Sequence, residues 1–114
     1  MSDFDGVFAA LRAVMLNHAE GLTVTRDAPG DLVVRTRTLD ATGEAEWFGA
    51  VTIKKSYVAF HLMPIYCDPA LAADLSPDLT RRRQGKSCFN FKREEPALFA
   101  ELDRLTGRAR EVVD

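Results

Sequence analysis

One stretch of the chain, residues 47–66 (WFGAVTIKKSYVAFHLMPIY), restricts the fold more than any other. It is rich in β-branched and aromatic residues on both sides of Lys55-Ser56, a pattern typical of two strands joined by a tight turn. If Lys54 faces Tyr57, the two-residue period of a strand sorts the side chains into two faces. The core face is predicted to hold Val51, Ile53, Val58, Phe60 and Leu62, with Trp47 on the same side. The other face, with small residues in its middle, is predicted to hold Phe48, Ala50, Thr52, Tyr57, Ala59, His61 and Met63.

The 114 residues are enough for a single domain, 1–114, with its own hydrophobic core. A net charge of −2 gives no whole-chain argument for a nucleic-acid partner, and we expect none. The sequence has neither an apolar run of about 20 residues nor a basic start followed by an apolar segment, so we expect a cytoplasmic protein without a membrane partner. The two cysteines, Cys67 and Cys88, are expected to be reduced thiols in that compartment.

Helices are predicted at both ends of the chain. The first begins after Ser2-Asp3 and is expected to end at Gly21 in a left-handed conformation. Its apolar stripe is Phe4, Val7, Phe8, Leu11, Val14 and Met15. The last begins at Glu95-Pro96, and everything from Gly107 onward is expected to be a frayed, charged tail. Its buried stripe is predicted to be Leu98, Phe99, Leu102 and Leu105.

The remaining elements follow from alternation and turn chemistry. Strands are predicted at 22–25 and 32–39, joined by a turn at 28–31 (APGD), and residues 40–44 form a polar loop. At Pro64 the fourth strand should end, bulge or lie on an edge of the sheet, because proline has no N–H to donate to a neighbouring strand. Short helices are expected from Asp68-Pro69 through Leu75 and from Ser76-Pro77 towards Arg83. In a fifth strand, 87–91, Phe89 and Phe91 should point inward, and Cys88 and Asn90 outward.

This order of elements is helix, four strands, short helices, a fifth strand and a helix. Strands linked mostly by hairpins, with the long helices at the two ends, indicate an α+β fold. We predict a two-layer sandwich in which the N- and C-terminal helices cover one face of a mostly antiparallel five-stranded sheet. The opposite face is then free of helices, and it is the main source of functional hypotheses.

Two phrases of the sequence resemble the YdhG-like family of domains of unknown function, whose fold is related to frataxin. They are residues 55–62 (KSYVAFHL) and 85–92 (GKSCFNFK), the second followed by a helix of the type 96–102 (PALFAEL). The resemblance runs from residue 47 to the end of the chain. Frataxin-like members have been linked to iron delivery through acidic residues of the first helix, where this chain offers Asp3, Asp5 and Glu20. The resemblance thus implies the frataxin-related fold and, as one alternative function, iron handling.

Two residues of the predicted helix-free face have side chains that could take part in metal binding or catalysis. His61 can bind a metal, move a proton or contact an anion, but the sequence has no CxxC or HxxxH pattern to complete a metal site. Cys88 beside Lys86 is a candidate thiolate, and His61 is the one base that this face offers it. A small enzyme that uses His61 and Cys88 is therefore another alternative, although no catalytic motif surrounds either residue. We expect no cofactor.

Cations surround this face as well. Arg35, Arg37 and Lys54 are predicted to project beside Tyr57 and His61, and cations around small side chains can hold a carboxylate, a phosphate or an acidic peptide. The run 81–83 (RRR) is compatible with a phosphate contact, but also with a solvated turn. Phe48, Tyr57 and Met63 are harder to bury if helices cover the other face only, which favours an apolar groove or a homodimer seam.

The leading hypothesis is therefore a small binding or interaction module rather than an enzyme. Its partner would be a small anionic or partly apolar ligand, or another protein, on the open sheet face. The predicted ligand-binding residues are Arg35, Arg37, Phe48, Lys54, Tyr57, His61, Met63, Cys88 and Asn90.

Overall fold

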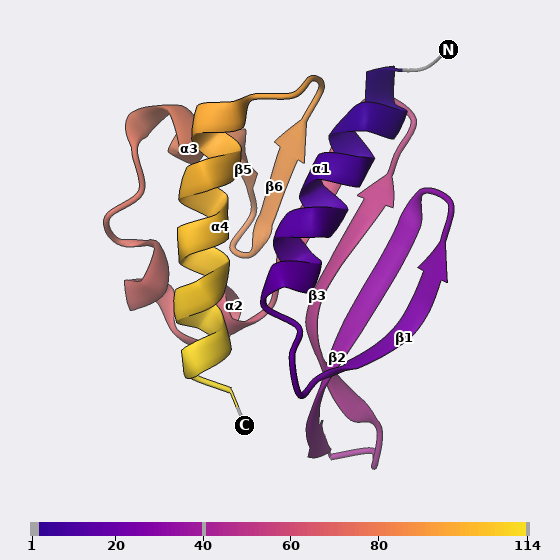
Figure 1. Ribbon diagram of the computed structural model, residues 1–114. Coiled ribbons are helices and arrows are strands. Elements are labelled where there is room, and N and C mark those ends of the chain that lie inside the picture. Colours follow the sequence, from indigo (N-terminus) through magenta and orange to yellow (C-terminus); the bar gives the residue numbers. More distant parts are fainter. Residues whose placement is uncertain (1–2, 40, 114) are drawn as a thin grey trace.

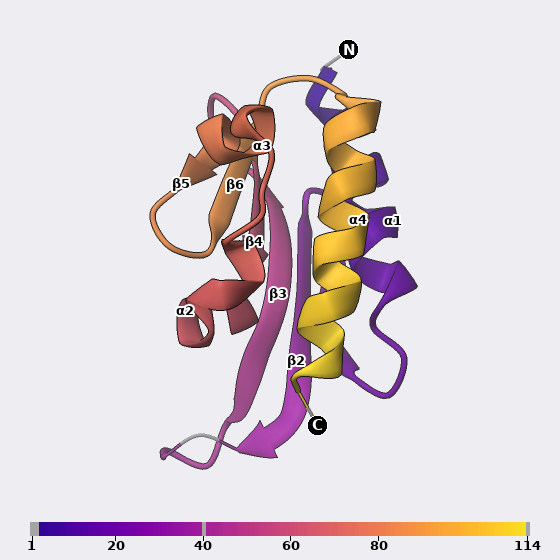
Figure 2. The ribbon, with the colours of Figure 1, turned by 90° about the vertical axis from the view of Figure 1, so that its left-hand side faces the viewer.

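An antiparallel sheet forms one layer of the molecule and two long helices form the other (Figure 1). The computed structural model describes residues 3–39 and 41–113. Helices α1 (Asp3–Asn17) and α4 (Pro96–Glu111) lie side by side on one face of the sheet, as the edge-on view in Figure 2 shows. The predicted α+β two-layer fold, with the terminal helices on one face, is confirmed.

Within the described residues the sheet has six strands, one more than predicted. Their order is β1-β2-β3-β4-β6-β5, and every neighbouring pair is antiparallel. The extra strand, β5, arises because α3 ends at Arg82 and the next two residues are extended and pair with β6. The strands are β1 (Thr23–Ala28), β2 (Asp31–Leu39), β3 (Ala45–Ile53), β4 (Val58–Leu62), β5 (Arg83–Gln84) and β6 (Cys88–Phe91).

The β3–β4 hairpin has the predicted register. The backbone N–H of Lys54 donates to the carbonyl of Tyr57 at 2.8 Å, and Ala50 lies opposite His61. Val51, Val58, Phe60 and Leu62, predicted for the core face, are buried in the core, and Ile53 packs against it with some exposure. The two-residue period therefore places these side chains correctly from Gly49 to Leu62.

The predicted sides of Trp47 and Phe48 are wrong, because β3 contains a β-bulge. Val34 pairs with Gly49 but the next residue, Arg35, pairs with Trp47, so Phe48 is an extra residue in β3. A bulge shifts the alternation by one position. Phe48 is consequently fully buried in the core, whereas Trp47 is 38% exposed and lies against His61 on the other face.

Helix α1 lies close to the sheet where β3 has glycine. A Cβ atom on Gly49 would be 2.4 Å from Met15 Cε and 2.6 Å from the carbonyl oxygen of His61. Only glycine allows this approach. The core between the layers combines apolar residues of α1, the sheet and α4, among them Val7, Leu11, Met15, Phe48, Phe60, Leu62, Phe89, Phe91, Leu102 and Leu105.

Two predicted helix ends differ from the structure. Gly21 is left-handed with φ 80°, but α1 already ends at Asn17 and Gly21 belongs to a later turn. Helix α4 continues to Glu111 instead of fraying from Gly107. Its last turns are held by α1 and the loop after it, because the ring of His18 packs over Gly107 and the Arg110 guanidinium donates to the carbonyl of Glu20.

Three short helical segments connect β4 to β5. Pro64 ends β4 as predicted, but it also begins an unpredicted helix, α2 (Pro64–Cys67). Instead of a helix through Leu75, the structure has a 3-10 helix, η1 (Pro69–Ala72). Helix α3 (Pro77–Arg82) begins as predicted, since the Ser76 hydroxyl caps it by accepting a hydrogen bond from the Leu79 N–H.

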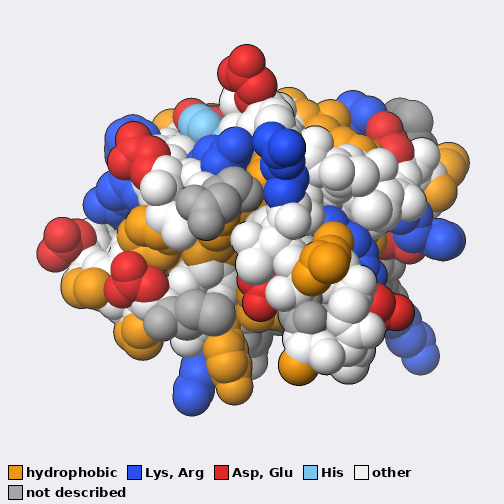
Figure 3. All heavy atoms as spheres, turned by 90° about the horizontal axis from the view of Figure 1, so that it is seen from below, with side chains coloured by type: hydrophobic (Ala, Val, Ile, Leu, Met, Phe, Trp, Pro, Cys, Tyr) orange, Lys and Arg blue, Asp and Glu red, His pale blue; other side chains and the backbone are white. Residues whose placement is uncertain are grey.

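Figure 3 shows the end of the molecule that carries the C-terminal end of α4 and the β2–β3 connection. Lys and Arg side chains alternate there with Asp and Glu side chains, so this end has no large field of one sign. Within the described part of the chain, no helix combines the length and the hydropathy of a membrane span.

Candidate functional site

The strand register gathers chemically useful side chains on the sheet face that α1 and α4 leave uncovered, called the open face here. Directly paired residues of an antiparallel sheet project to the same side. Val33, Ala50, His61, Cys88 and Gln84 are successive partners across β2, β3, β4, β6 and β5. The predicted neighbours His61 and Cys88 are thus adjacent in one row.

A second row of the open face runs parallel to the first. It contains Thr52, Ala59 and Asn90, which are successive partners across β3, β4 and β6. Lys54 lies close enough to this face for its charge to lower the pKa values of both His61 and Cys88. The middle of the face is made of small side chains, as predicted, and larger polar side chains surround them.

His61 is a half-buried imidazole with two neighbours. Its Nε2 shares a hydrogen bond of 3.3 Å with the hydroxyl of Ser87, and its ring makes an edge contact with Trp47 at a centroid distance of 6.5 Å. Burial lowers the pKa of His61 from its ordinary 6.5, and the charge of Lys54 lowers it further. The imidazole is therefore neutral at pH 7.

Cys88 is a half-buried thiol that donates its hydrogen bond to Asn90 Oδ1 at 3.4 Å. Burial raises the pKa of Cys88, and this outweighs the opposite effect of the Lys54 charge. A protonated thiol that points its hydrogen at an amide oxygen is a weak nucleophile. Catalysis through His61 and Cys88 stays a prediction that this arrangement does not favour.

The remaining predicted site residues lie apart from this group. Arg35 covers Trp47, with Cζ 5.7 Å from the ring centroid, and its guanidinium donates to the carbonyl of Ala45 at 2.6 Å. Arg37 is exposed and lies within a second irregularity of the β2–β3 pairing, between Arg35 and Leu39. Met63 is half-buried just after β4. Phe48 belongs to the core, so it cannot contact a ligand on the open face.

A groove of about 620 Å³ opens where the open face reaches α3 and the β6–α4 connection. We call it the basic groove, because four of its eight lining residues are cationic. Tyr57 and Asn90 come from the predicted site, and Gln84 comes from the edge strand β5. The complete lining is Tyr57, Arg81, Arg82, Gln84, Asn90, Lys92, Arg93 and Glu95.

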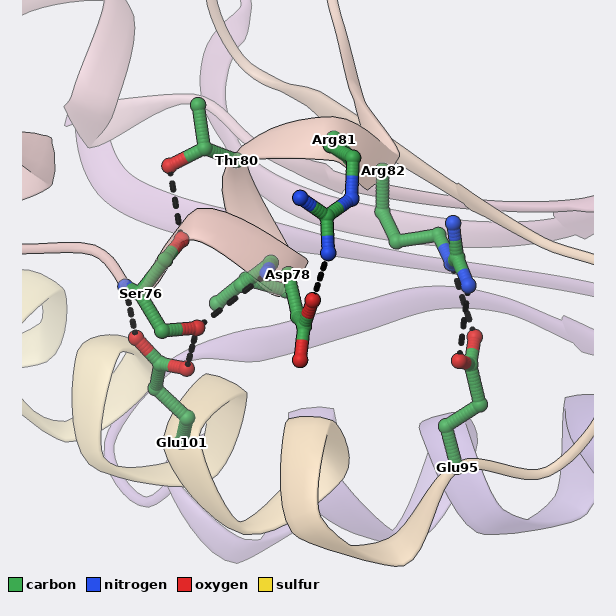
Figure 4. A network of polar contacts seen from close by, with 8 residues as sticks. Ser76, Asp78, Thr80, Arg81, Arg82, Glu95 and Glu101 are labelled. Carbon is green, nitrogen blue, oxygen red and sulfur yellow. Dashed lines mark hydrogen bonds and ion pairs between the residues drawn. The ribbon is translucent and has the colours of Figure 1, made fainter.

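One wall of the basic groove is attached to α4 by charged hydrogen bonds (Figure 4). Arg82 donates to both carboxylate oxygens of Glu95, each at 2.8 Å, and this pairing holds the pKa of Glu95 below its ordinary 4.5. At the other end of α3, the hydroxyl and N–H of Ser76 donate to Glu101 at 2.6 and 2.8 Å. These contacts fix the position of α3 beside the groove.

The cations of the groove differ in what they already bind. Arg82 is occupied by Glu95, and Arg81 pairs with Asp78 of its own helix. Lys92 and Arg93, in the connection that follows β6, make no ion pair or side-chain hydrogen bond with the described residues. The Arg93 charge does help to lower the pKa of Glu95, but neither Lys92 nor Arg93 makes a direct ion pair with a carboxylate of the described residues.

The described residues contain no group of three or more His, Cys, Asp or Glu side chains arranged to hold a metal ion. Of the acidic residues that the resemblance implied for iron, Asp5 and Glu20 lie at opposite ends of α1 and the side chain of Asp3 is outside the described part of the structure. Iron handling stays a prediction without a ligand set among these residues.

Comparison of the chain with protein-family models, curated proteins and solved structures finds no significant match. The resemblance to the YdhG-like family therefore stays a prediction.

The sequence contained a partial signal for the basic groove. The run 81–83 is compatible with a phosphate contact, but Arg83 does not line the groove and the Arg82 guanidinium is hydrogen-bonded to Glu95. Lys92 and Arg93 were missed, because they follow a strand like many solvated charges. What connects them to Gln84 is the β5–β6 pairing, which pattern analysis did not predict.

Proposed function

We propose that this protein is a small binding module whose basic groove holds the anionic group of a ligand or of an acidic protein segment. The supporting observation is that Lys92 and Arg93 line a concave site and make no ion pair or side-chain hydrogen bond with the described residues. The one carboxylate that lines the groove, Glu95, interacts with Arg93 through its charge but has both oxygens hydrogen-bonded to Arg82. Cations that converge in a groove raise the local concentration of anions and make strong charge-assisted hydrogen bonds with them.

Neutral polar side chains complete the groove. Gln84 and Asn90 carry amides and Tyr57 carries a phenol, and all three line it between the cations. A volume of about 620 Å³ falls within the range of small-molecule sites. We place this activity in the cytoplasm as part of the same proposal, because Cys88 is a free thiol on the open face.

The test is a titration of the ¹⁵N-labelled protein with citrate at low ionic strength, followed by NMR. We expect saturable shifts at Lys92, Arg93 and the side-chain amides of Gln84 and Asn90. The double variant K92Q/R93Q should weaken the affinity at least about tenfold, because each lost charged hydrogen bond removes ~1.5–3 kcal/mol.

The matched control is R104Q/R108Q, which removes the same charge from exposed positions on α4. It should leave the affinity for citrate unchanged. If the shifts spread over α1 and α4, or if both double variants weaken binding equally, the groove is not a site and the cations are solvated surface charge.

A further inference from the structure

The basic groove is rich in hydrogen-bond donors and poor in free acceptors. Both carboxylate oxygens of Glu95 are taken by Arg82, and Asp78 pairs with Arg81. Asn90 Oδ1 accepts the hydrogen of the Cys88 thiol, which leaves the Nδ2 donor of Asn90 for the groove. A ligand that suits this groove must therefore supply hydrogen-bond acceptors, because the groove itself has few free ones.

The positive charges of the groove further restrict the class of ligand that it can bind. Lys92 and Arg93 are consecutive residues, both line the groove, and neither forms a direct ion pair within the described chain. The nearby carboxylate of Glu95 already neutralises Arg82, so the groove keeps a net positive charge. A single carboxylate neutralises one positive charge. A phosphate monoester carries about −1.5 to −2 charges at pH 7 and three strong acceptor oxygens. Arginine matches the spacing of such oxygens with two parallel N–H donors, and lysine adds a compact charge beside it.

The size of the groove indicates what carries the phosphoryl group. A space of about 620 Å³ exceeds what a lone phosphate fills and suits a small organic molecule. Half-buried Tyr57 lines the groove and offers such a molecule an aromatic ring and a hydroxyl. Gln84 contributes an amide from the edge strand.

Building on the proposed function, we infer that the basic groove selects a doubly charged phosphoryl group on a small organic molecule. Lys92 and Arg93 neutralise the two charges, and the amides of Asn90 and Gln84 donate to the remaining phosphoryl oxygens. Carboxylates and singly charged anions bind the same place more weakly. This preference follows from the number of free donors and charges together, since neither alone distinguishes a phosphate from two carboxylates.

The experiment compares three aromatic anions by calorimetry and NMR at pH 7.5: phenyl phosphate, phthalate and benzenesulfonate. Phthalate matches the double charge without a phosphoryl group, and benzenesulfonate matches the tetrahedral shape with a single charge. We expect phenyl phosphate to bind at least tenfold more tightly than either. K92Q and R93Q should each reduce this preference, whereas R104Q should retain it.

A change of pH gives a second readout. Phenyl phosphate should bind several-fold more weakly at pH 5.5 than at pH 7.5, because it gains a proton near pH 6. Benzenesulfonate keeps its charge over this range, so any change in its binding reports titration of the protein, for example of His61 on the open face. The pH effect of phenyl phosphate is corrected by that of benzenesulfonate.

The outcomes separate the two proposals. If phthalate binds as tightly as phenyl phosphate and shifts the same groove residues, the phosphoryl preference is overturned and the anion site stands. If none of the anions shifts Lys92, Arg93, Gln84 or Asn90, both proposals fail. Because Lys92 and Arg93 are exposed and make no direct ion pair with the described residues, their variants should fold, and an unchanged circular dichroism melt verifies this.

Discussion

The two faces of the sheet are built from neighbouring residues of the same strands, yet their environments differ sharply. On the covered face, Val51, Phe60 and Phe89 are successive partners with no exposed surface. One residue away, Ala50, His61 and Cys88 form the corresponding row on the open face. The comparison shows that alternation creates a core and a surface together, and that the helices decide which is which.

The difference has a consequence for what each face can do. Burial of a large apolar side chain contributes about 1.5–3 kcal/mol, so the covered face carries much of the stability. The open face carries hydrogen-bonded polar groups whose net contribution to folding is small. It is therefore the face on which side chains are available for binding.

The strongest challenge to this comparison is to truncate adjacent residues of β4. Phe60→Ala should destabilise the protein by ~3–5 kcal/mol, because it leaves a cavity in the core. His61→Ala should cost about 1 kcal/mol, mainly through the lost hydrogen bond with the nearly buried Ser87 hydroxyl. Urea unfolding measures both. Equal losses would mean that the open face is as structural as the covered one.

The contact of α1 with the covered face can be tested at Gly49. Gly49→Ala should cost ~1–3 kcal/mol, since the new methyl group meets the carbonyl oxygen of His61 and the end of Met15. Gly6→Ala is the matched control within α1, where the nearest atom is the mobile carboxylate of Glu94 at 3.1 Å. It should be neutral or stabilise by up to ~1 kcal/mol, as alanine favours a helix. A thermal melt in which both variants behave alike would contradict the close packing at Gly49.

The wall of the basic groove predicts a pH dependence. Glu95→Gln should destabilise by ~1–2 kcal/mol through the loss of its two charged hydrogen bonds with Arg82. Because folding lowers the pKa of Glu95 from 4.5, the pair contributes fully above about pH 4.5 and is lost as the pH falls through the lower, folded value. The free energy of unfolding should therefore fall more on acidification in the native protein than in Glu95→Gln.

The exposed ion pair of Arg12 and Asp27 is the control for this prediction. Folding lowers the pKa of Asp27 through its hydrogen bonds with Arg12, but both side chains are about 40% exposed. Asp27→Asn should therefore have a smaller effect than Glu95→Gln, and added salt should reduce it further. A larger effect for Asp27→Asn would show that α3 is not held at α4 by Arg82.

The smallest expected effect concerns the titration of His61. Its NMR midpoint should lie below 6.5, and Lys54→Gln should raise it without restoring the ordinary value, since burial is the larger cause. The unfolded chain binds this proton more readily, so His61 should lower the stability as the pH falls below about 6.5. If Lys54→Gln leaves the titration midpoint of His61 unchanged, the charge of Lys54 does not act on the open face.

The sequence pattern predicts the positions of several residues of the candidate site, but not of all of them. The sequence pattern places His61, Cys88 and Asn90 correctly because uninterrupted strands alternate. The predicted faces of Phe48 and Trp47 are wrong because one extra residue in β3 reverses the alternation, and the local sequence does not predict this bulge. The sequence pattern does not single out Lys92 and Arg93, because the groove that they line is formed together with segments distant in sequence.

The chain alone determined the β3–β4 hairpin, the two long helices and the apolar set that they bury. These follow from short-range periodicity and from the cost of leaving apolar surface in water. Only the tertiary structure decided the bulge, the sixth strand and the groove between α3 and the β6–α4 connection. Those depend on pairing and packing between remote segments, where the free energy of a contact is shared by residues that no sequence window contains together.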